Sequence, residues 1–491
     1  MAKKEKWEII ASEYEVSLFP VFMLVDGFKD GIKKVHGQGC SIAIKLENNS
    51  VIYVYLPSQW ARAHELIVKK ITTDISYLEK IFSQIYIQCH KLENIGRKIN
   101  NLKLSKKSNL DLYNLYQSFY KQNILTYGYG GTMPMLDFQK HTFFSDELLK
   151  YLKKKVKKEL VSRYFVILTT PTKDTFDRLE QKDILKLYAE IYQKRININN
   201  LPKNIDTKLS KHIKKWAWLP YLYQGPAGDR SYFLDELKDF KRRKIDPSKR
   251  LREFEEEKEK IKNEQREIIK IIKPDKFYKK LIELARESVF LKVYRRSYQT
   301  KGYYLIEPLL NEIAKRLHLT IKQVRFMLPQ EVKTALKAGR LNLTEINSRT
   351  NYCVYKNTAK QKLVFTGQKA RDFFNQVKKE KIDKSLKTIK GTTACAGKAK
   401  GTVKIINSIQ DMKKMKAGDI LVSGATNPNL MPAIRQASAI VTDEGGLSCH
   451  AAIVSRELNI PCVVGTGFIT QVVKDGDRLQ VDANNAIVKK L

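Results

Sequence analysis

The spacing of apolar residues changes twice along the chain, and the first region has the pattern of strands. β-Branched and aromatic residues alternate or cluster over residues 13–25 and 40–56. Within the second segment, Glu47-Asn48-Asn49-Ser50 separates the apolar runs 41–46 and 51–56, which predicts a β-hairpin. The chain is therefore expected to begin with a small α+β segment that contains this hairpin.

From about Ser58 the apolar residues recur every three or four positions, which is typical of amphipathic helices. This long region is expected to be mostly α-helical. Helices are predicted over residues 61–92, 110–125, 146–160, 182–195, 208–218, 230–241, 247–272, 275–298 and 303–317.

The last hundred residues return to short apolar runs separated by glycine-containing turns. Residues 438–442 form a β-branched run that predicts a buried strand, and Asp443-Glu444-Gly445-Gly446 predicts the turn after it. A helix with an apolar face is expected next, then a second strand over 461–465. Strands that alternate with helices predict a C-terminal α/β domain.

These patterns predict a multidomain protein with four parts. They are an α+β entry segment (1–58), a helical region (59–377), a linker (378–390) and the C-terminal domain (391–491). The linker is rich in charge and has only scattered apolar residues, so we interpret it as a solvated tether; the alternative is a short surface helix.

Composition limits the class of protein. The 491 residues are 43% apolar, which is enough for several hydrophobic cores. We find no N-terminal signal-like run and no apolar run near the roughly 18 residues of a membrane helix, so no membrane partner is expected. Six cysteines without a C-x-x-C pair favour a cytoplasmic protein.

The formal net charge of +39 permits a nucleic-acid partner, because Lys and Arg neutralise phosphates. The basic residues, however, are spread over most of the chain and mixed with acids, as in 249–258. We therefore favour a solvated charged surface and keep nucleic-acid binding as a weaker alternative.

His450 is the candidate chemical group of the C-terminal domain. Ser448 is suited to cap the predicted helix, which would place His450 in its first turn. The positive end of a helix dipole favours an anion there, so a phosphate on the imidazole would be stabilised. The alternative is an ordinary histidine at a helix start.

The string TDEGGLSCHAAIVSRELNIPCVVGT (442–466) resembles the signature of the mobile, or swivelling, phosphohistidine domain of phosphoenolpyruvate-utilising enzymes. That group includes phosphoenolpyruvate synthase, pyruvate phosphate dikinase and rifampin phosphotransferase. The resemblance extends upstream over 391–406 and 419–443 and downstream over 474–488. It implies a swivelling α/β fold and identifies His450 as the residue that is phosphorylated.

The resemblance also indicates which residues surround the phosphate. They are Thr426, Gly445, Gly446, Ser448, Cys449 and Arg456. Three of them have simpler explanations: helix capping for Ser448, apolar packing for Cys449, and an ion pair with Glu457 or contact with solvent for Arg456. For Arg456 the simpler explanation is favoured, because an offset of six residues from His450 does not place both side chains on one helix face. The chain departs from the family at Asn429, where the Thr-x-Pro turn usually continues with an acid.

The donor of the phosphoryl group is not evident. We recognise neither a G-x-x-x-x-G-K-[ST] loop nor an ATP-grasp pattern, and no chain follows Leu491 to form a barrel. A separate ATP-grasp or phosphoenolpyruvate-binding protein is therefore expected as a partner. No cofactor is identifiable, and Mg²⁺ is implied only if ATP is the donor.

Parts of the helical region, such as 324–332, echo the middle region of phosphoenolpyruvate-synthase-like proteins, which can bind the acceptor. We therefore expect a small-molecule acceptor in the helical region. The Gly-rich run 127–132 permits a ligand pocket, but a helix-to-loop turn is favoured. The other histidines lack metal-ligand spacing, so no metal site is expected; they are His36, His64, His90, His141, His212 and His318.

Three functions are consistent with the sequence. The first is a phosphotransferase that works through a phosphohistidine. The second is a non-catalytic binding or regulatory module that retains the swivelling fold. The third is a basic nucleic-acid-associated protein.

Overall fold

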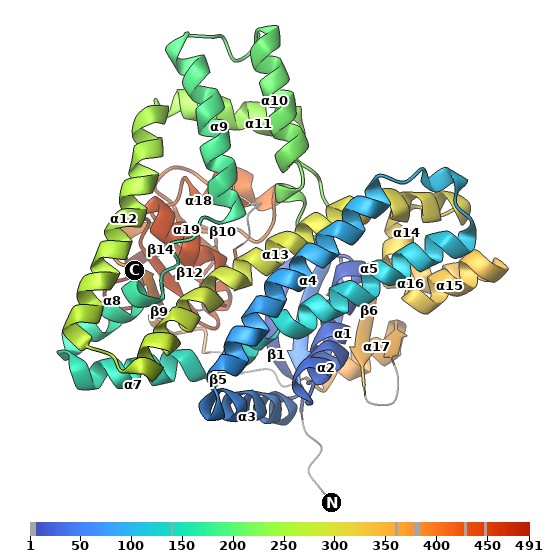
Figure 1. Ribbon diagram of the computed structural model, residues 1–491, viewed down its shortest axis with the longest axis horizontal. Coiled ribbons are helices and arrows are strands. Elements are labelled where there is room, and N and C mark those ends of the chain that lie inside the picture. Colours follow the sequence, from blue (N-terminus) through green and yellow to red (C-terminus); the bar gives the residue numbers. More distant parts are fainter. Residues whose placement is uncertain (1–5, 139–140, 359–361, 378–382, 427–429, 446–448) are drawn as a thin grey trace, which may run out of the picture. The chain divides into compact units, whose positions relative to one another are not determined.

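The computed structural model describes residues 6–491 apart from 139–140, 359–361, 378–382, 427–429 and 446–448 (Figure 1). The chain forms two compact units, and each is assembled from separate stretches of sequence. The first unit contains Met1–Val25, Cys40–Trp60 and Asn342–Leu491, and the second contains Asp26–Gly39 and Ala61–Leu341. The chain therefore passes between the units four times.

The first unit contains a five-stranded antiparallel sheet that joins the N-terminal strands to two strands about 300 residues later. Its strand order is β1 (Glu8–Tyr14), β3 (Ser50–Tyr55), β2 (Ile42–Glu47), β6 (Tyr352–Asn357) and β7 (Lys362–Phe365). The β2–β3 hairpin confirms the prediction. Its turn residues Asn48 and Asn49 have φ values of 48° and 63°, which suits the turn of a tight hairpin.

The segment 13–25 corrects one sequence prediction, because most of it is not a strand. Only Glu13 and Tyr14 belong to β1, and a helix, α1, follows at Leu18–Asp26. It continues through a π-helical turn, η1 (Gly27–Gly31), into α2 (Ile32–His36). Nearly every side chain of α1 is buried, so the apolar residues lie all round the helix and show no 3.6-residue spacing.

The second unit is built from helices, as the sequence predicted. Several boundaries differ. The predicted helix 146–160 covers the end of one helix, Phe143–Lys155, and the start of the next, Lys158–Thr169. The predicted helices 275–298 and 303–317 form one helix of 41 residues, α13 (Lys276–Arg316). The predicted helix 61–92 is two helices, separated at Asp74, whose carboxylate accepts a hydrogen bond from the Ser76 backbone N–H at 2.9 Å. The main helices are α3 (Pro57–Thr73), α4 (Ser76–Asn100), α5 (Asn109–Gly130), α6 (Thr132–Leu136), α7 (Phe143–Lys155), α8 (Lys158–Thr169), α9 (Phe176–Gln193), α10 (Lys203–Trp216), α11 (Arg230–Arg242), α12 (Pro247–Ile272), α13, α14 (Ile321–Arg325) and α15 (Pro329–Ala338).

The Gly-rich run 127–132 does not form the helix-to-loop turn that the sequence favours, and the alternative of a ligand pocket stays a prediction. The run continues α5 to Gly130 and leads directly into α6. A Cβ atom on Gly128 would lie 2.6 Å from the backbone of Gly31, and a Cβ on Gly31 would lie 2.6 Å from the carbonyl oxygen of Ile124. These glycines therefore allow α5 and the π-helical turn η1 to pack backbone against backbone.

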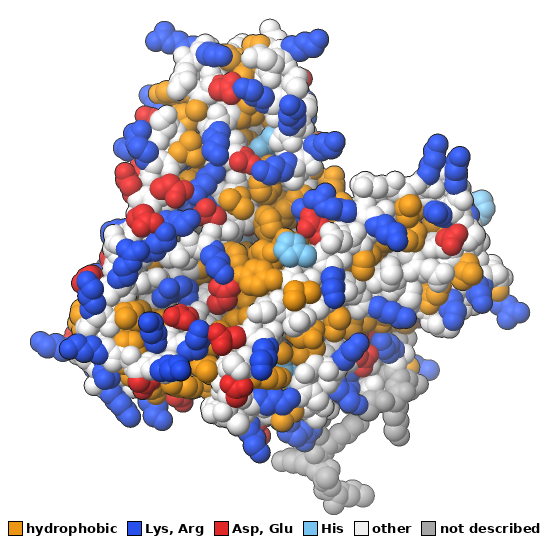
Figure 2. Space-filling model, viewed as in Figure 1, with side chains coloured by type: hydrophobic (Ala, Val, Ile, Leu, Met, Phe, Trp, Pro, Cys, Tyr) orange, Lys and Arg blue, Asp and Glu red, His pale blue; other side chains and the backbone are white. Residues whose placement is uncertain are grey.

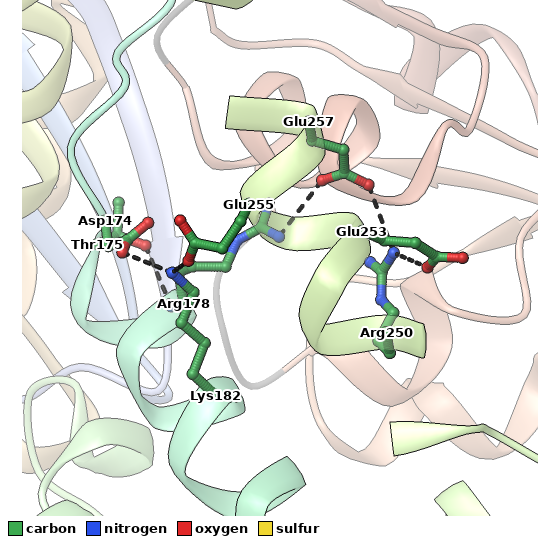
Figure 3. Close-up of polar contacts among 8 residues, drawn as sticks. All are labelled: Asp174, Thr175, Arg178, Lys182, Arg250, Glu253, Glu255 and Glu257. Atoms are coloured by element: carbon green, nitrogen blue, oxygen red, sulfur yellow. Dashed lines mark hydrogen bonds and ion pairs between the residues drawn. The ribbon is translucent and has the colours of Figure 1, made fainter. Parts of the chain in front are cut away.

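Ion pairs connect the N-terminal part of α9 to α12 (Figure 3). The Lys182 Nζ lies 2.7 Å from Asp174 Oδ2 and 2.5 Å from Glu255 Oε1. Arg178 and Arg250 both approach Glu257, at 3.4 Å. Partly exposed pairs contribute little individually, so this network orients the two helices more than it stabilises them.

The remainder of the first unit is the C-terminal α/β region, built on an eight-stranded mixed sheet. Four neighbouring strands, β10 to β13, are parallel, and every pairing outside this group, β10–β14, β14–β15, β15–β8 and β13–β9, is antiparallel. In order the strands are β8 (Thr388–Lys390), β15 (Ile487–Lys490), β14 (Arg478–Asp482), β10 (Lys398–Ile405), β11 (Ile420–Ser423), β12 (Ala439–Thr442), β13 (Cys462–Val464) and β9 (Thr392–Cys395). Strand β8 is made from the last three residues of the segment predicted as a linker, while residues 378–382 lie outside the described part.

Both faces of this sheet are buried, and successive side chains point to opposite faces. Leu421 and Ile440 face one core with α18 (Met431–Ile434) and α19 (His450–Leu458). Ile420 and Val441 face the other core with α20 (Ile469–Val472). Two-sided burial explains why these strands appear in the sequence as continuous apolar runs. α16 (Leu343–Asn351) and α17 (Gly367–Asn375) complete the first unit.

No helix in the described residues is long and apolar enough to cross a membrane.

Candidate functional site

His450 is the first residue of α19 and follows the central strand β12, as the sequence predicted. The turn between them begins with Thr442, whose hydroxyl donates to the Glu444 carbonyl at 2.7 Å. Gly445 has a φ of 117°, and a Cβ atom there would lie 2.6 Å from Cys449 Sγ. Glycine is therefore required at 445 by both the backbone conformation and the close sulfur.

The residue that caps α19 is Cys449. Its Sγ accepts a hydrogen bond from the Ala452 backbone N–H at 3.4 Å. The sequence predicts this role for Ser448, which lies outside the described residues, as does Gly446. Sulfur is a weak acceptor, which is why the prediction favoured the serine hydroxyl.

Thr426 is the side chain that the structure brings to the imidazole. Its Oγ1 lies 2.9 Å from His450 Nδ1, and Thr426 is 7% exposed. Thr426 follows β11, which pairs in parallel with β12, so the loops that carry the two residues leave the same edge of the sheet. That edge is where open α/β sheets place their functional groups.

The loop before Thr426 is held by its own polar contacts. Ser423 donates its hydroxyl to the Ala425 carbonyl at 2.8 Å. Asn407 Oδ1 accepts a hydrogen bond from the Gly424 N–H at 2.9 Å. The position of Thr426 is therefore fixed by the end of β11, while its continuation through 427–429, including Asn429, lies outside the described residues.

Asp443 anchors the turn before His450, a role that the sequence did not indicate. It accepts hydrogen bonds from the Thr470 backbone N–H at 3.0 Å and from the Thr470 hydroxyl. Burial raises the pKa of Asp443, whereas the hydrogen bonds from Thr470 and Thr466 oppose that rise. A polar residue directly after a buried strand was the only signal in the sequence.

Arg456 lies one and a half turns along α19 from His450. Its Nε donates to the Ala452 carbonyl of the same helix at 2.9 Å. This contact holds the Nε end of the Arg456 guanidinium against the backbone of its own helix. Its expected role near the phosphate stays a prediction.

The described residues contain no group of three His, Cys, Asp or Glu side chains that could hold a metal ion. Two buried histidines of the helical unit have protein partners. His36 lies between the Tyr77 hydroxyl, at 2.6 Å, and Thr132 Oγ1, at 2.8 Å. His212 Nε2 lies 2.9 Å from Glu180 Oε1.

Comparison with known proteins identifies the region that contains His450. Residues 415–486 match the family model described as PEP-utilising enzyme, mobile domain. A probable phosphoenolpyruvate synthase of Methanothermobacter thermautotrophicus is 53% identical over 100 residues, which are 20% of this chain and 15% of the relative. A probable phosphoenolpyruvate synthase of Archaeoglobus fulgidus is 41% identical over 160 residues, 33% of this chain and 19% of the relative.

A longer match, to the phosphoenolpyruvate synthase of Aeropyrum pernix, is 35% identical over 179 residues, or 36% of this chain and 21% of the relative. The chain thus spans about a fifth or less of the length of these curated relatives. Sequence identity is high within the matched segments, but these segments make up a minority of this chain and of each relative.

Proposed function

We propose that this chain is a phosphotransfer protein that carries a phosphoryl group on Nε2 of His450. The observation that carries the proposal is the 2.9 Å contact between Thr426 Oγ1 and His450 Nδ1. It engages Nδ1, and we assign the role of nucleophile to Nε2. The match of residues 415–486 to the mobile domain of PEP-utilising enzymes supports the same chemistry.

The chemistry follows from the tautomer. In our proposal Nδ1–H donates to Thr426 Oγ1, so that Nε2 keeps its lone pair. Nε2 attacks the phosphorus atom, an N–P bond forms, and the bond from phosphorus to the donor oxygen breaks with its electron pair on that oxygen. The phosphorylated ring is cationic, and its Nδ1 proton remains shared with Thr426. The N-terminus of α19 adds a favourable dipole for the transferred anion.

We further propose that ATP or phosphoenolpyruvate is the donor, bound by a separate protein, and that Mg²⁺ takes part only with ATP. The helical unit is the proposed acceptor-binding part. Figure 2 shows hydrophobic side chains gathered on the face that carries α4 and α13. There Tyr294 packs against Tyr86 with ring centroids 4.9 Å apart and against Phe176 at 5.9 Å. Hydrophobic and aromatic side chains are the usual lining of small-molecule sites, which supports this assignment.

The direct test is acid-labile phosphate on the protein. Wild type and His450→Ala are incubated with labelled ATP or phosphoenolpyruvate, with and without extract of the native host. We expect label on the wild type alone, lost in acid and stable in base. If neither donor labels the wild type in the presence of extract, the chain is better explained as a non-catalytic module that retains the fold.

A further inference from the structure

The turn that precedes His450 makes a contact with the N-terminal sheet of the same unit. Glu444 Oε1 accepts two hydrogen bonds from Ser12, one from its backbone N–H at 2.7 Å and one from its hydroxyl at 3.1 Å. The loop after β11 approaches the same residue, because a Cβ atom on Gly424 would lie 3.6 Å from Ser12 Oγ. Both loops that form the His450 site therefore face one position of β1.

Strand β1 is suited to this contact because it lies at the edge of its sheet. It pairs with β3 on one side only, with Ser12 opposite Ile52. Edge strands present backbone N–H groups that need a partner. The Glu444 carboxyl is the hydrogen-bond acceptor for the Ser12 backbone N–H. At other edge strands this acceptor is commonly water or a further strand.

Acidic groups surround the contact in the described residues. Glu13 from β1 and Asp443 from the turn before His450 both raise the pKa of Glu444. Burial raises the pKa of Tyr14, and the charges of Glu444, Asp443 and Asp411 of η4 (Gln410–Lys414) raise it further. The Glu444 carboxyl group therefore lies near other acidic groups and also accepts two hydrogen bonds from Ser12.

We propose that the second half of β1, centred on Ser12, is the docking surface on which the carrier region rests between transfers, held through Glu444. The inference deepens the proposed function and rests on it, because a carrier that delivers phosphate at one place and accepts it at another must bind and release. Release breaks two hydrogen bonds of one side chain. It also frees the turn that leads into α19.

Docking is coupled to a proton. Burial raises the pKa of Glu444 from its ordinary value of 4.5 to about 8 in the docked form, while the bonds from Ser12 oppose the rise. In the released form the carboxyl is solvated and returns to its ordinary value. The equilibrium constant for docking is therefore highest below about pH 4.5. It falls by roughly tenfold per pH unit as the pH rises from there toward 8.

The test is hydrogen exchange at the Ser12 amide, followed by mass spectrometry on peptides that cover β1 in the full-length chain. Rates are divided by the intrinsic rate at each pH. In the wild type we expect protection of Ser12 to fall severalfold or more between pH 6 and 9. Glu444→Gln keeps an acceptor without a charge, so its protection is expected to be independent of pH. Glu444→Ala is expected to lack the protection at every pH.

Two further variants separate docking from folding. Ser12→Ala removes one donor from the opposite side of the contact, and we expect intermediate protection. Glu47→Gln changes a glutamate of β2 that pairs with Lys45 at 2.7 Å, and should behave as wild type. Unchanged exchange of peptides from β11 and β12 shows that the variants are folded.

Equal protection of Ser12 in wild type and folded Glu444→Ala would overturn the docking proposal. That result leaves the proposed function intact if His450 still takes up label. Conversely, pH-dependent protection without any label on His450 would support docking and count against phosphotransfer. The two proposals therefore fail on different readouts.

Discussion

The hydroxyl of Thr426 and the Nδ1 atom of His450 lie 2.9 Å apart, and each residue comes from the loop after one of two adjacent parallel strands. In the proposed mechanism this contact holds Nδ1, and Nε2 is the nucleophile. It depends on the register between β11 and β12, where Ser423 lies opposite Thr442. A change in either loop would therefore alter the orientation of the imidazole.

Thr426→Val should slow phosphorylation of His450, because valine has a similar shape and no hydrogen-bonding group. A typical hydrogen bond is worth about 0.5–1.5 kcal/mol, so we expect the rate to fall by roughly two- to tenfold. The measurement is the rate of acid-labile label. Thr426→Ser keeps the hydroxyl and should stay close to wild type; equal rates for wild type and the valine variant would refute the role of this contact.

Asp443→Ala should destabilise the C-terminal α/β region. The substitution leaves the Thr470 backbone N–H and hydroxyl without their acceptor, at a cost of about 1–3 kcal/mol. Urea unfolding, followed by hydrogen exchange of β12 peptides, measures the change. Asp235→Ala, which removes an exposed carboxylate that pairs with Lys238, serves as the control.

The helical unit should lose stability in acid through His36. Burial lowers the pKa of this imidazole to about 3, from an ordinary 6.5, so the unfolded state binds the proton first. The contribution of His36 to the free energy of unfolding is fully present above pH 6.5. It falls by about 1.4 kcal/mol per pH unit as the pH drops toward 3. Chemical unfolding at several pH values measures the slope.

His36→Gln should flatten that slope, since glutamine can bond to Tyr77 and Thr132 without titrating. His212, whose pKa burial lowers to about 4, contributes in the same direction, so part of the slope remains. His318→Gln changes an exposed histidine and should retain the wild-type slope. An unaltered slope in His36→Gln would disprove the assignment.

Gly128→Ala should disrupt the packing of α5 against η1. The new methyl group would lie 2.6 Å from the backbone of Gly31, which cannot move aside as a side chain can. Overpacking of this kind costs about 1–3 kcal/mol. Gly96→Ala is the comparison, because its methyl would meet the Leu305 side chain at 3.0 Å and should cost less. The midpoint temperatures of thermal unfolding of the two variants show which substitution is more destabilising.

Local patterns in the sequence predicted the elements that depend on neighbouring residues. The β2–β3 hairpin follows from Asn48 and Asn49, and the start of α19 at His450 follows from the strand and turn before it. Helix α12 begins and ends at the predicted residues because Asp246 caps it and Pro247 occupies its first position. Each of these signals lies within a few residues of the feature it specifies.

Contacts between distant parts of the sequence could not be predicted in this way. Nothing near Ser12 indicates Glu444, and nothing near Ile44 indicates its partner Tyr355. Helix α1 was missed because burial on all sides removes the periodicity that reveals a helix. The contact of Thr426 with His450 required the order of the parallel strands, which periodicity does not contain.

The discontinuous construction of the first unit has a consequence for how the protein is made. Strand β2 receives its second neighbour, β6, only after about 300 further residues. A ribosome that adds roughly 5–20 residues per second takes about 15–60 s to synthesise that stretch. Throughout this time the nascent hairpin has an open, apolar edge, so a chaperone or the early-folding helices must shield it from other growing chains.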